Sequence, residues 1–325
     1  MIITVTLNAA IDKTLAVPNF RLGRRHRAVE QTSMAGGKGV NVARALKSLD
    51  QPVIATGFAG GPVGTRIIEQ LTDEHILNDF VRIREESRMS TAVVDPTSGE
   101  QTEINERGPA VSEGELELFV NKLLYLARGA AICVFSGSLP RGVDPGLYAR
   151  LVGELRKLDV VSIVDAEGEA MRLATRAGPD VVSPNEIEAE ELVGHEFADS
   201  DDRATAVREI VGMGAREAIM TMPDGCLALL GSDTDATRPR KLCRATLDPL
   251  EPISSVGSGD AFLAGWVAAR YDDRPAEECL RFGVACGAES TQHFGAGVIN
   301  RREVNRLLAE VEMETLDPSA LSSAH

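Results

Sequence analysis

Short apolar runs alternate with longer amphipathic stretches along most of this chain of 325 residues. The runs lie at 2–7, 53–58, 131–135, 160–164, 181–182 and 218–220. They are too short for buried helices, but they have the length and composition of strands buried on both faces of a sheet. Strand–helix–strand repeats are typical of parallel pairing with helical crossovers. The pattern therefore predicts an α/β fold with a central, mostly parallel sheet and helices on both faces.

Two segments interrupt this alternation, at 15–33 and 79–104. Both alternate polar and apolar residues, and the second contains a turn signal at 96–99 between two strand-like runs. Strands that lie so far apart in the sequence would have to pair with each other. We therefore expect a smaller β sheet that forms a lid, built from segments near 12–34 and 79–107.

The composition indicates a soluble globular protein. Hydrophobic residues make up 43% of the chain, enough for a large core, which we assign to one domain at 1–316 followed by a flexible tail at 317–325. Acidic residues outnumber basic ones by 49 to 34, and the net charge of −15 argues against nucleic-acid binding. No apolar run approaches the roughly 20 residues that span a membrane, so we expect a cytoplasmic protein without a membrane partner.

A glycine cluster at 255–260 runs directly into an apolar helical segment. Glycines at a helix N-terminus bring backbone N–H groups and the positive end of the helix dipole close to a ligand, which suits a phosphate. Asp260 adds a carboxylate, which repels an anion but can take the proton of an attacking hydroxyl. The cluster suggests phosphoryl transfer to an alcohol, although taken alone it is equally typical of an ordinary turn.

A second glycine cluster, at 36–41, also precedes a helical segment and contains Lys38. It is not a Walker A loop, because glycine follows the lysine where serine or threonine is required. Lys38 could still meet an anionic substrate at the helix N-terminus. A tight turn with an exposed lysine is the alternative.

Three further polar groups follow predicted strands, and in open α/β sheets ligands bind beyond the carboxyl ends of the strands. Asp12 could accept hydrogen bonds from sugar hydroxyls, or form an Asx turn. The segment 136–140 could wrap a substrate closely, or be a routine loop. Asn185 and Glu188 share a helical face and could organise Mg²⁺, or start a solvated helix. Together these groups indicate a small-molecule kinase.

The order of these motifs resembles the PfkB, or ribokinase-like, family of carbohydrate kinases. The matching segments are 6–12, 36–41, 136–140, 185–188 and 257–260, so the resemblance spans nearly the whole chain. The Gly-Gly-Lys-Gly-Val-Asn-Val-Ala-Arg, Ser-Gly-Ser-Leu-Pro and 102–109 segments are similar to the phosphosugar branch, the 1-phosphofructokinases and tagatose-6-phosphate kinases. The resemblance implies ATP and Mg²⁺ as cofactors and, by family analogy, a possible homodimer formed through the lid.

The resemblance also implies a role for each site residue. Asp260 would be the catalytic base, and Gly257, Ser258 and Gly259 would form an anion hole. Lys38 and Arg88 would hold the phosphate of the sugar. The expected sugar contacts are Asp12, Gly37, Asn41, Asn105 and Ser138; the expected nucleotide and metal contacts are Asn185, Glu188, Thr221, Gly225, Gly259 and Cys286.

The sequence departs from the family pattern at two places. Ser258 replaces the usual alanine of the anion hole, a change that backbone donors tolerate. In the nucleotide loop at 221–225, Pro223 stands near the first glycine position and the loop is shorter. Because proline lacks an N–H donor and fixes φ, this second departure bears on nucleotide binding.

The resemblance predicts phosphorylation of a ketohexose monophosphate, above all of fructose 1-phosphate to fructose 1,6-bisphosphate. Kinases of tagatose 6-phosphate or fructose 6-phosphate are alternatives within the same branch. A kinase of an unphosphorylated sugar or nucleoside is a second alternative. The altered loop around Pro223 raises a third, a catalytically silent sugar-phosphate sensor.

Overall fold

A computed structural model describes residues 1–231 and 240–316, so the expected tail at 317–325 lies outside the described residues. The strands of its large sheet are β1 (Ile2–Thr6), β4 (Val53–Gly60), β5 (Leu77–Asn78), β6 (Val81–Ile83), β9 (Ile132–Ser136), β10 (Val161–Asp165), β11 (Val181–Val182), β12 (Glu217–Met222), β13 (Gly225–Leu230), β14 (Lys241–Thr246) and β15 (Glu312–Leu316). Their order is β15-β14-β13-β12-β11-β10-β9-β1-β4-β5, and β6 also pairs with β4, in parallel. Pairing is parallel from β12 to β5 and antiparallel from β12 to β15. The predicted mostly parallel sheet is confirmed.

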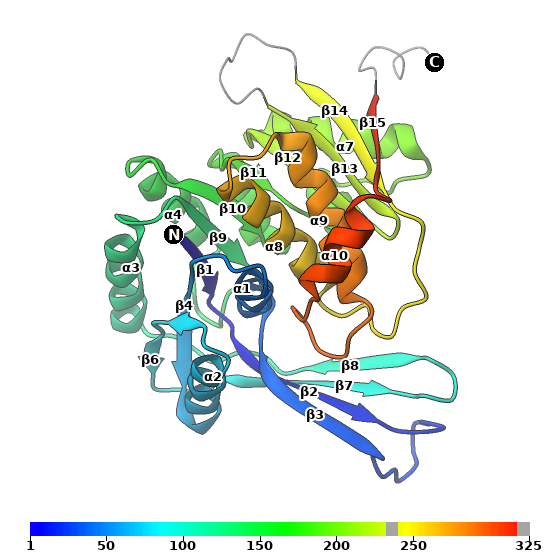
Figure 1. Ribbon diagram of the computed structural model, residues 1–325. Coiled ribbons are helices and arrows are strands. Elements are labelled where there is room, and N and C mark those ends of the chain that lie inside the picture. Colours follow the sequence, from blue (N-terminus) through cyan, green and yellow to red (C-terminus); the bar gives the residue numbers. More distant parts are fainter. Residues whose placement is uncertain (232–239, 317–325) are drawn as a thin grey trace.

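Helices cover both faces of this sheet (Figure 1). One hydrophobic core contains residues of α1 (Lys38–Ser48), α2 (Gly61–Asp73), α8 (Ser258–Tyr271), α9 (Ala276–Ser290) and α10 (Arg301–Leu308). The other contains residues of α3 (Glu113–Ala127), α4 (Leu147–Arg156), α5 (Gly168–Arg176), α6 (Glu186–Val193) and α7 (Ser200–Met213). Neighbouring residues of β1 divide between the cores, since Ile2 belongs to the first and Ile3 to the second. This two-sided burial explains the continuous apolar runs in the sequence.

A capping box fixes the start of α3. The side chain of Ser112 accepts a hydrogen bond from the backbone N–H of Glu115, and the carboxylate of Glu115 accepts one from the backbone of Ser112. The pair satisfies two N–H groups that a helix start leaves without partners.

A separate small sheet consists of β2 (Ala10–Ala16), β3 (Glu30–Gly36), β7 (Arg88–Val94) and β8 (Gln101–Asn105), in the order β3-β2-β7-β8. It projects from one end of the large sheet (Figure 1). The predicted turn at 96–99 does connect two of its strands. The segment before Arg88, however, does not join it, because Val81–Ile83 pairs in parallel with the long strand β4 of the large sheet.

All five cysteines lie in the described residues, are buried and form no disulfide. Within 1–231 and 240–316, no helix combines the length and the apolar character needed to cross a bilayer.

Helices α8 and α9 approach each other closely at Gly265. A Cβ atom added there would lie 2.6 Å from Sγ of Cys286 and 2.9 Å from the carbonyl oxygen of Phe282. Cys286 is fully buried in this contact. The two helices can pack at this distance only because position 265 has no side chain.

We expect Gly265→Ala to lower the free energy of unfolding by roughly 1–3 kcal/mol, because the new methyl group overpacks the helix contact. Gly153→Ala in α4 is the matched control, since a Cβ there meets no atom within 4 Å. This control should be neutral or gain up to about 1 kcal/mol from helix propensity. Urea unfolding measures both, and equal effects would contradict the packing argument.

Candidate active site

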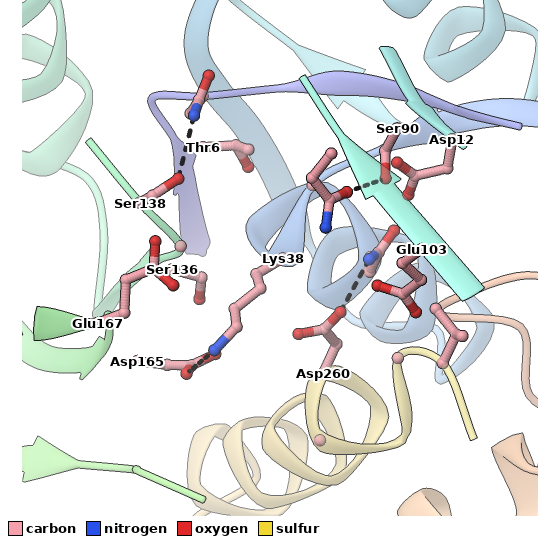
Figure 2. A pocket seen from close by; sticks show the side chains of 18 of the residues that line it. Thr6, Asp12, Lys38, Ser90, Glu103, Ser136, Ser138, Asp165, Glu167 and Asp260 are labelled. Atoms are coloured by element: carbon pink, nitrogen blue, oxygen red, sulfur yellow. Dashed lines mark hydrogen bonds and ion pairs between the residues drawn. The ribbon is translucent and has the colours of Figure 1, made fainter. Parts of the chain in front are cut away.

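A cavity of about 650 Å³ lies where strands β1, β9 and β10 end, and the small sheet forms its opposite wall. Thr6, Ser136 and Asp165, the last residues of these three strands, line it. Figure 2 shows Asp12, Ser90 and Glu103 on the small-sheet side, with Lys38 and Asp260 between them and the strand ends. The predicted site residues in its lining are Asp12, Gly37, Lys38, Asn41, Arg88, Asn105, Ser138, Asn185, Glu188, Thr221, Gly257, Ser258, Gly259 and Asp260.

The glycine loop before α8 places the N-terminus of that helix at the cavity. Gly257 caps the helix with φ 79°, a left-handed conformation that favours glycine. A Cβ at this position would lie 2.5 Å from Cβ of Ala296, so the neighbouring loop excludes any side chain as well. Ser258 and Gly259 line the cavity in the first turn. The first N–H groups of a helix lack acceptors within the helix, which makes this turn suited to an anion.

Asp260 is buried at the same helix start, with 6% of its surface exposed. Its Oδ2 accepts a hydrogen bond of 2.8 Å from Nδ2 of Asn41. Burial, reinforced by the charge of Asp165, raises the pKa of Asp260 to about 7, although Lys38 and Asn41 act in the opposite direction. This carboxyl group therefore exchanges its proton near neutral pH.

Lys38 lies between two carboxylates rather than alone at the helix start. Its Nζ contacts Oδ1 of Asp165 and Oε1 of Glu188, each at 2.9 Å. Burial by itself would lower the pKa of Lys38, but the two carboxylates outweigh burial and raise it. Lys38 therefore stays charged. It links the start of α1 to the last residue of β10 and to the first turn of α6.

Asn185 and Glu188 form a capping box at the start of α6. Oδ1 of Asn185 accepts from the backbone N–H of Glu188, and Oε2 of Glu188 accepts from the backbone N–H of Asn185, both at 2.9 Å. The three-residue spacing that suggested a shared helical face is also the capping-box spacing. Within the described residues, no group of three or more His, Cys, Asp or Glu side chains is arranged to hold a metal.

The register of the small sheet aligns three polar side chains toward the cavity. Asp12 lies opposite Ser90, and Ser90 lies opposite Asn105. Side chains alternate between the two faces of a sheet, so this row faces one side together. Ser90 Oγ and Asn105 Oδ1 are hydrogen-bonded, and Arg88, two residues before Ser90, donates from Nε to the carbonyl oxygen of Asn8.

Three buried polar atoms in the cavity lining have no hydrogen-bond partner: Thr6 Oγ1, Asn8 Oδ1 and Ser136 Oγ. Each of these atoms is enclosed by the protein itself, so these three residues can reach a ligand only through their other atoms. Sequence reasoning did not assign a role to several lining residues, namely Thr6, Ser90, Glu103, Arg107, Arg141, Asp165 and Glu167. Asp165 could have been found from the sequence, because it directly follows the predicted strand at 160–164, and ligands bind beyond the carboxyl ends of such strands.

A second cavity, of about 670 Å³, adjoins the first. The two share Asn185, Thr221, Ser255, Ser258 and Gly259 in their linings. They therefore meet at the first turn of α8, beside Asp260.

The segment 221–225 lines this second cavity as a tight hairpin. Met222 pairs with Gly225 across the two-residue turn formed by Pro223 and Asp224. Cys286 is a correction to the predicted set, because it lines neither cavity; its side chain packs against Gly265 between α8 and α9. Residues on another face of α9, Val284, Gly287 and Ala288, line the cavity instead.

Comparison with known proteins agrees with this geometry. A family model described as pfkB family carbohydrate kinase matches residues 4–302. The chain belongs to the pfkB family of carbohydrate kinases. A 1-phosphofructokinase of Borreliella burgdorferi is 30% identical over 97% of this chain and 99% of its own length. A tagatose-6-phosphate kinase of Staphylococcus epidermidis is 29% identical over 96% of this chain and 99% of its own length.

Solved structures of relatives have the same fold. Phosphofructokinase-2 from Escherichia coli in complex with substrates and products superimposes with a TM-score of 0.87 at 30% identity, over 95% of this kinase and 98% of that chain. A ribokinase from Arabidopsis thaliana, at 20% identity and a TM-score of 0.74 over 94% of this kinase and 98% of that chain, agrees in fold. The predicted ribokinase-like fold and carbohydrate kinase activity class are confirmed.

The raised pKa of Asp260 has a consequence for stability. The unfolded chain loses this proton near the ordinary pKa of 3.8, whereas the folded protein keeps it until about pH 7. The carboxyl group therefore destabilises the fold increasingly as the pH rises between these values. Asp260→Asn removes this effect. The free energy of unfolding of the variant, relative to that of the wild type, should therefore be higher at pH 8 than at pH 5 by on the order of 2 kcal/mol.

Urea unfolding at both pH values measures this difference. Asp73→Asn, at an exposed position at the end of α2, is the control for removal of a carboxylate outside the site. A gain for Asp260→Asn that is the same at pH 5 and pH 8 would exclude the raised pKa.

Proposed function

We propose that this kinase transfers a phosphoryl group from ATP to a hydroxyl of a ketohexose monophosphate, with fructose 1-phosphate as the preferred acceptor and fructose 1,6-bisphosphate as the product. The observation that carries this proposal is the position of Asp260, a buried carboxyl group at the junction of two cavities. One cavity has a polar lining that suits a sugar. The relatives named 1-phosphofructokinase support the choice of acceptor.

Asp260 is the proposed catalytic base. A base acts best when its pKa lies near the working pH, and burial raises the pKa of Asp260 to about 7. It takes the proton of the sugar hydroxyl as that oxygen attacks the terminal phosphoryl group, and the bond between this group and the bridging oxygen breaks to release ADP. The backbone N–H groups of Gly257 and Gly259 are proposed to face the charge on the transferring group, with that of Ser258 joining them once it leaves the carbonyl oxygen of Ser255, to which it donates at 3.3 Å. No covalent intermediate with the protein is needed, because the hydroxyl oxygen itself forms the new bond to phosphorus.

Arg88 and Lys38 are proposed to hold the phosphate already present on the sugar. Arg88 extends from the small sheet and uses only Nε in its hydrogen bond to Asn8, which leaves the planar end of the guanidinium for a phosphate. Lys38 supplies a fixed positive charge nearer to Asp260. Asp12, Asn41 and Asn105 are placed to bind sugar hydroxyls.

The second cavity is proposed to bind ATP. Its lining includes apolar side chains on two sides, from Leu247 and Leu250 and from Phe262 and Val284, which suits the flat face of a base. Thr221 and Gly225 of the hairpin contribute polar and backbone atoms. Because the shared lining of the two cavities includes Ser258 and Gly259, the triphosphate would point toward the anion hole.

The residues at the junction fit Mg²⁺ bound largely through water. Mg²⁺ keeps several waters in such sites and takes one or two carboxylates together with substrate phosphates. Asn185 and Glu188 would orient those waters. Each carboxylate oxygen of Glu188 accepts one hydrogen bond, from Lys38 or from the backbone of Asn185. A carboxylate oxygen can accept a second one, so a water could bind there as well. When bound, the metal would neutralise charge on the triphosphate.

The small sheet is proposed to act as a lid over the sugar and as the contact with a second copy of the chain. Exclusion of water protects the transferring group from hydrolysis. Three large apolar residues are exposed on the sheet and its connecting loop: Leu22 at 89%, Val29 at 70% and Ile104 at 60%. A second copy would cover them.

We expect the purified protein to release ADP from ATP and Mg²⁺ fastest with fructose 1-phosphate, when compared with fructose 6-phosphate, tagatose 6-phosphate, fructose and ribose. Asp260→Asn should reduce kcat by about 1,000-fold or more, with little change in the KM of either substrate, because only the proton transfer is lost. Coupled measurement of ADP release gives both parameters.

Arg88→Met is the matched test of the phosphate contact. It should raise the KM for fructose 1-phosphate and leave the KM for ATP unchanged. Turnover that is fastest with fructose or ribose, or an Arg88→Met variant with unaltered KM values, would instead support a kinase of an unphosphorylated sugar. Binding of a sugar phosphate without turnover would support the silent sensor.

We expect the wild type to sediment as a dimer and Ile104→Lys to shift it toward the monomer, because a charge on the covered face of the small sheet would lose its hydration. Tyr125→Lys is the control: this residue is 73% exposed and belongs to α3, a helix that Figure 1 shows apart from the small sheet. Sedimentation velocity distinguishes the two species. A monomeric wild type, or a dimer that both variants leave intact, would contradict this interface.

A further inference from the structure

Arg44 lies one helical turn after Asn41 in α1 and is 6% exposed. Its guanidinium carries five N–H donors. Nε and Nη2 donate to the carboxylate of Glu74, at the end of α2. Nη2 also donates to the carbonyl oxygen of Ala35 at 2.6 Å, and Nη1 donates to the carbonyl oxygen of Ala296 at 3.0 Å and to Oδ1 of Asn41 at 3.3 Å. Arg44 therefore connects four separate segments of the chain behind the cavity.

The contact with Asn41 determines which way its amide points. A guanidinium can only donate, so it must face the carbonyl oxygen of the amide. The amide nitrogen then faces Oδ2 of Asp260, at 2.8 Å. The opposite orientation would place donor against donor and oxygen against carboxylate. Asn41 is 5% exposed, so water has little access to relieve such contacts.

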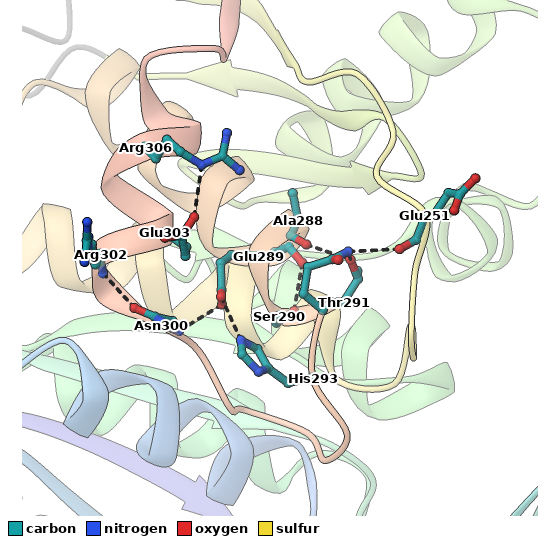
Figure 3. A network of polar contacts seen from close by, with 12 residues as sticks. Glu251, Ala288, Glu289, Ser290, Thr291, His293, Asn300, Arg302, Glu303 and Arg306 are labelled. Atoms are coloured by element: carbon teal, nitrogen blue, oxygen red, sulfur yellow. Dashed lines mark hydrogen bonds and ion pairs between the residues drawn. The ribbon is translucent and has the colours of Figure 1, made fainter.

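The contact with Ala296 supports the loop behind the anion hole. Ala296 packs directly against Gly257. The same loop is also held by Glu289 of α9, which accepts hydrogen bonds from His293 and from the backbone of Asn300 (Figure 3). Side chains from two helices, α1 and α9, therefore hold this loop.

We propose that Arg44 is a positioning residue for phosphoryl transfer: it directs the amide nitrogen of Asn41 at Asp260 and thereby sets the protonation of that carboxyl group. The inference rests on the proposed function, in which Asp260 is the base. A donated hydrogen bond favours the charged carboxylate and lowers its pKa. Lys38, Asp165 and Asp12 also face Asp260, from α1, β10 and β2.

Arg44→Lys tests the proposal, because lysine keeps the positive charge near Glu74 but lacks the fork that reaches Asn41 at the same time. The released amide can rotate, so the acidic limb of kcat against pH should move upward by about one unit. At pH 6.5 kcat should fall about tenfold, with recovery at higher pH. The KM for ATP should stay within about twofold of the wild type.

Glu74→Gln is the matched control. It breaks the ion pair on the far side of the same guanidinium and leaves the contact with Asn41 in place. A lower melting temperature with an unchanged pH profile is the expected result. A merely structural role for Arg44 would make the two variants alike, and equal pH profiles in them would overturn the proposal.

A second readout needs no activity. The carboxyl carbon of Asp260, assigned by its loss in Asp260→Asn, can be titrated by carbon-13 NMR in the protein without substrates. Its midpoint should rise in Arg44→Lys and not in Glu74→Gln; an unchanged midpoint in Arg44→Lys overturns the proposal. A raised midpoint in a protein that phosphorylates none of the sugars would support the positioning of Asp260 and reject the proposed reaction.

If Arg44→Lys does not fold, Arg44→Met combined with Glu74→Gln gives the same test without an unpaired carboxylate. The comparison is then with Glu74→Gln alone. The midpoint of Asp260 must again be higher in the double variant for the proposal to hold.

Discussion

The hydrogen bond from Asn41 to Asp260 joins the two glycine loops on which the rest of the site depends. Each loop begins a helix of the same layer, α1 at Lys38 and α8 at Ser258, and the two helices pack against each other. A side chain at Gly257 would push the start of α8 away from the loop that contains Ala296. The close approach brings two helix N-termini to one edge of the sheet, where their dipoles favour the same anionic ligands.

The site is acidic although it is proposed to bind two anionic substrates. Asp12, Asp165, Glu188 and Asp260 line one cavity, in a chain with a net charge of −15. Lys38 compensates part of this charge beside Asp165 and Glu188, and its ion pairs with these two carboxylates keep it protonated. In such a site the raised pKa of Asp260 follows from burial among like charges. A cation that arrives with the nucleotide would then complete the charge balance at the junction.

Local patterns in the sequence were sufficient for the sheet and the glycine loops. Strands buried on both faces appear as continuous apolar runs, and a glycine cluster directly before a helical segment can be recognised from neighbouring residues alone. Contacts across the fold were not predictable in this way. The partners of Lys38 lie 127 and 150 residues away, and the spacing of Asn185 and Glu188 fits both a ligand pair and a capping box.

Two errors have the same origin. The segment Val81–Ile83 alternates in polarity like the lid strands, but the length of β4 provides it with a partner in the large sheet. Cys286 lies on a helix that does line the second cavity, but on a face turned toward Gly265. In both cases the element was near the expected place, and its orientation depended on packing that single-sequence patterns do not encode.

The hairpin around Pro223 illustrates how a departure from a family pattern can be absorbed. Proline removes one N–H, yet position 223 lies in the turn between paired Met222 and Gly225, where the strand ladder needs no donor. Asp224 is tied to β14 and the segment after it, through Arg244 and the backbone of Leu247. The turn is therefore held in place without the missing donor. If the second cavity binds ATP, the substitution removes a possible phosphate contact but keeps the shape of the wall, so it should affect affinity for the triphosphate more than recognition of the base.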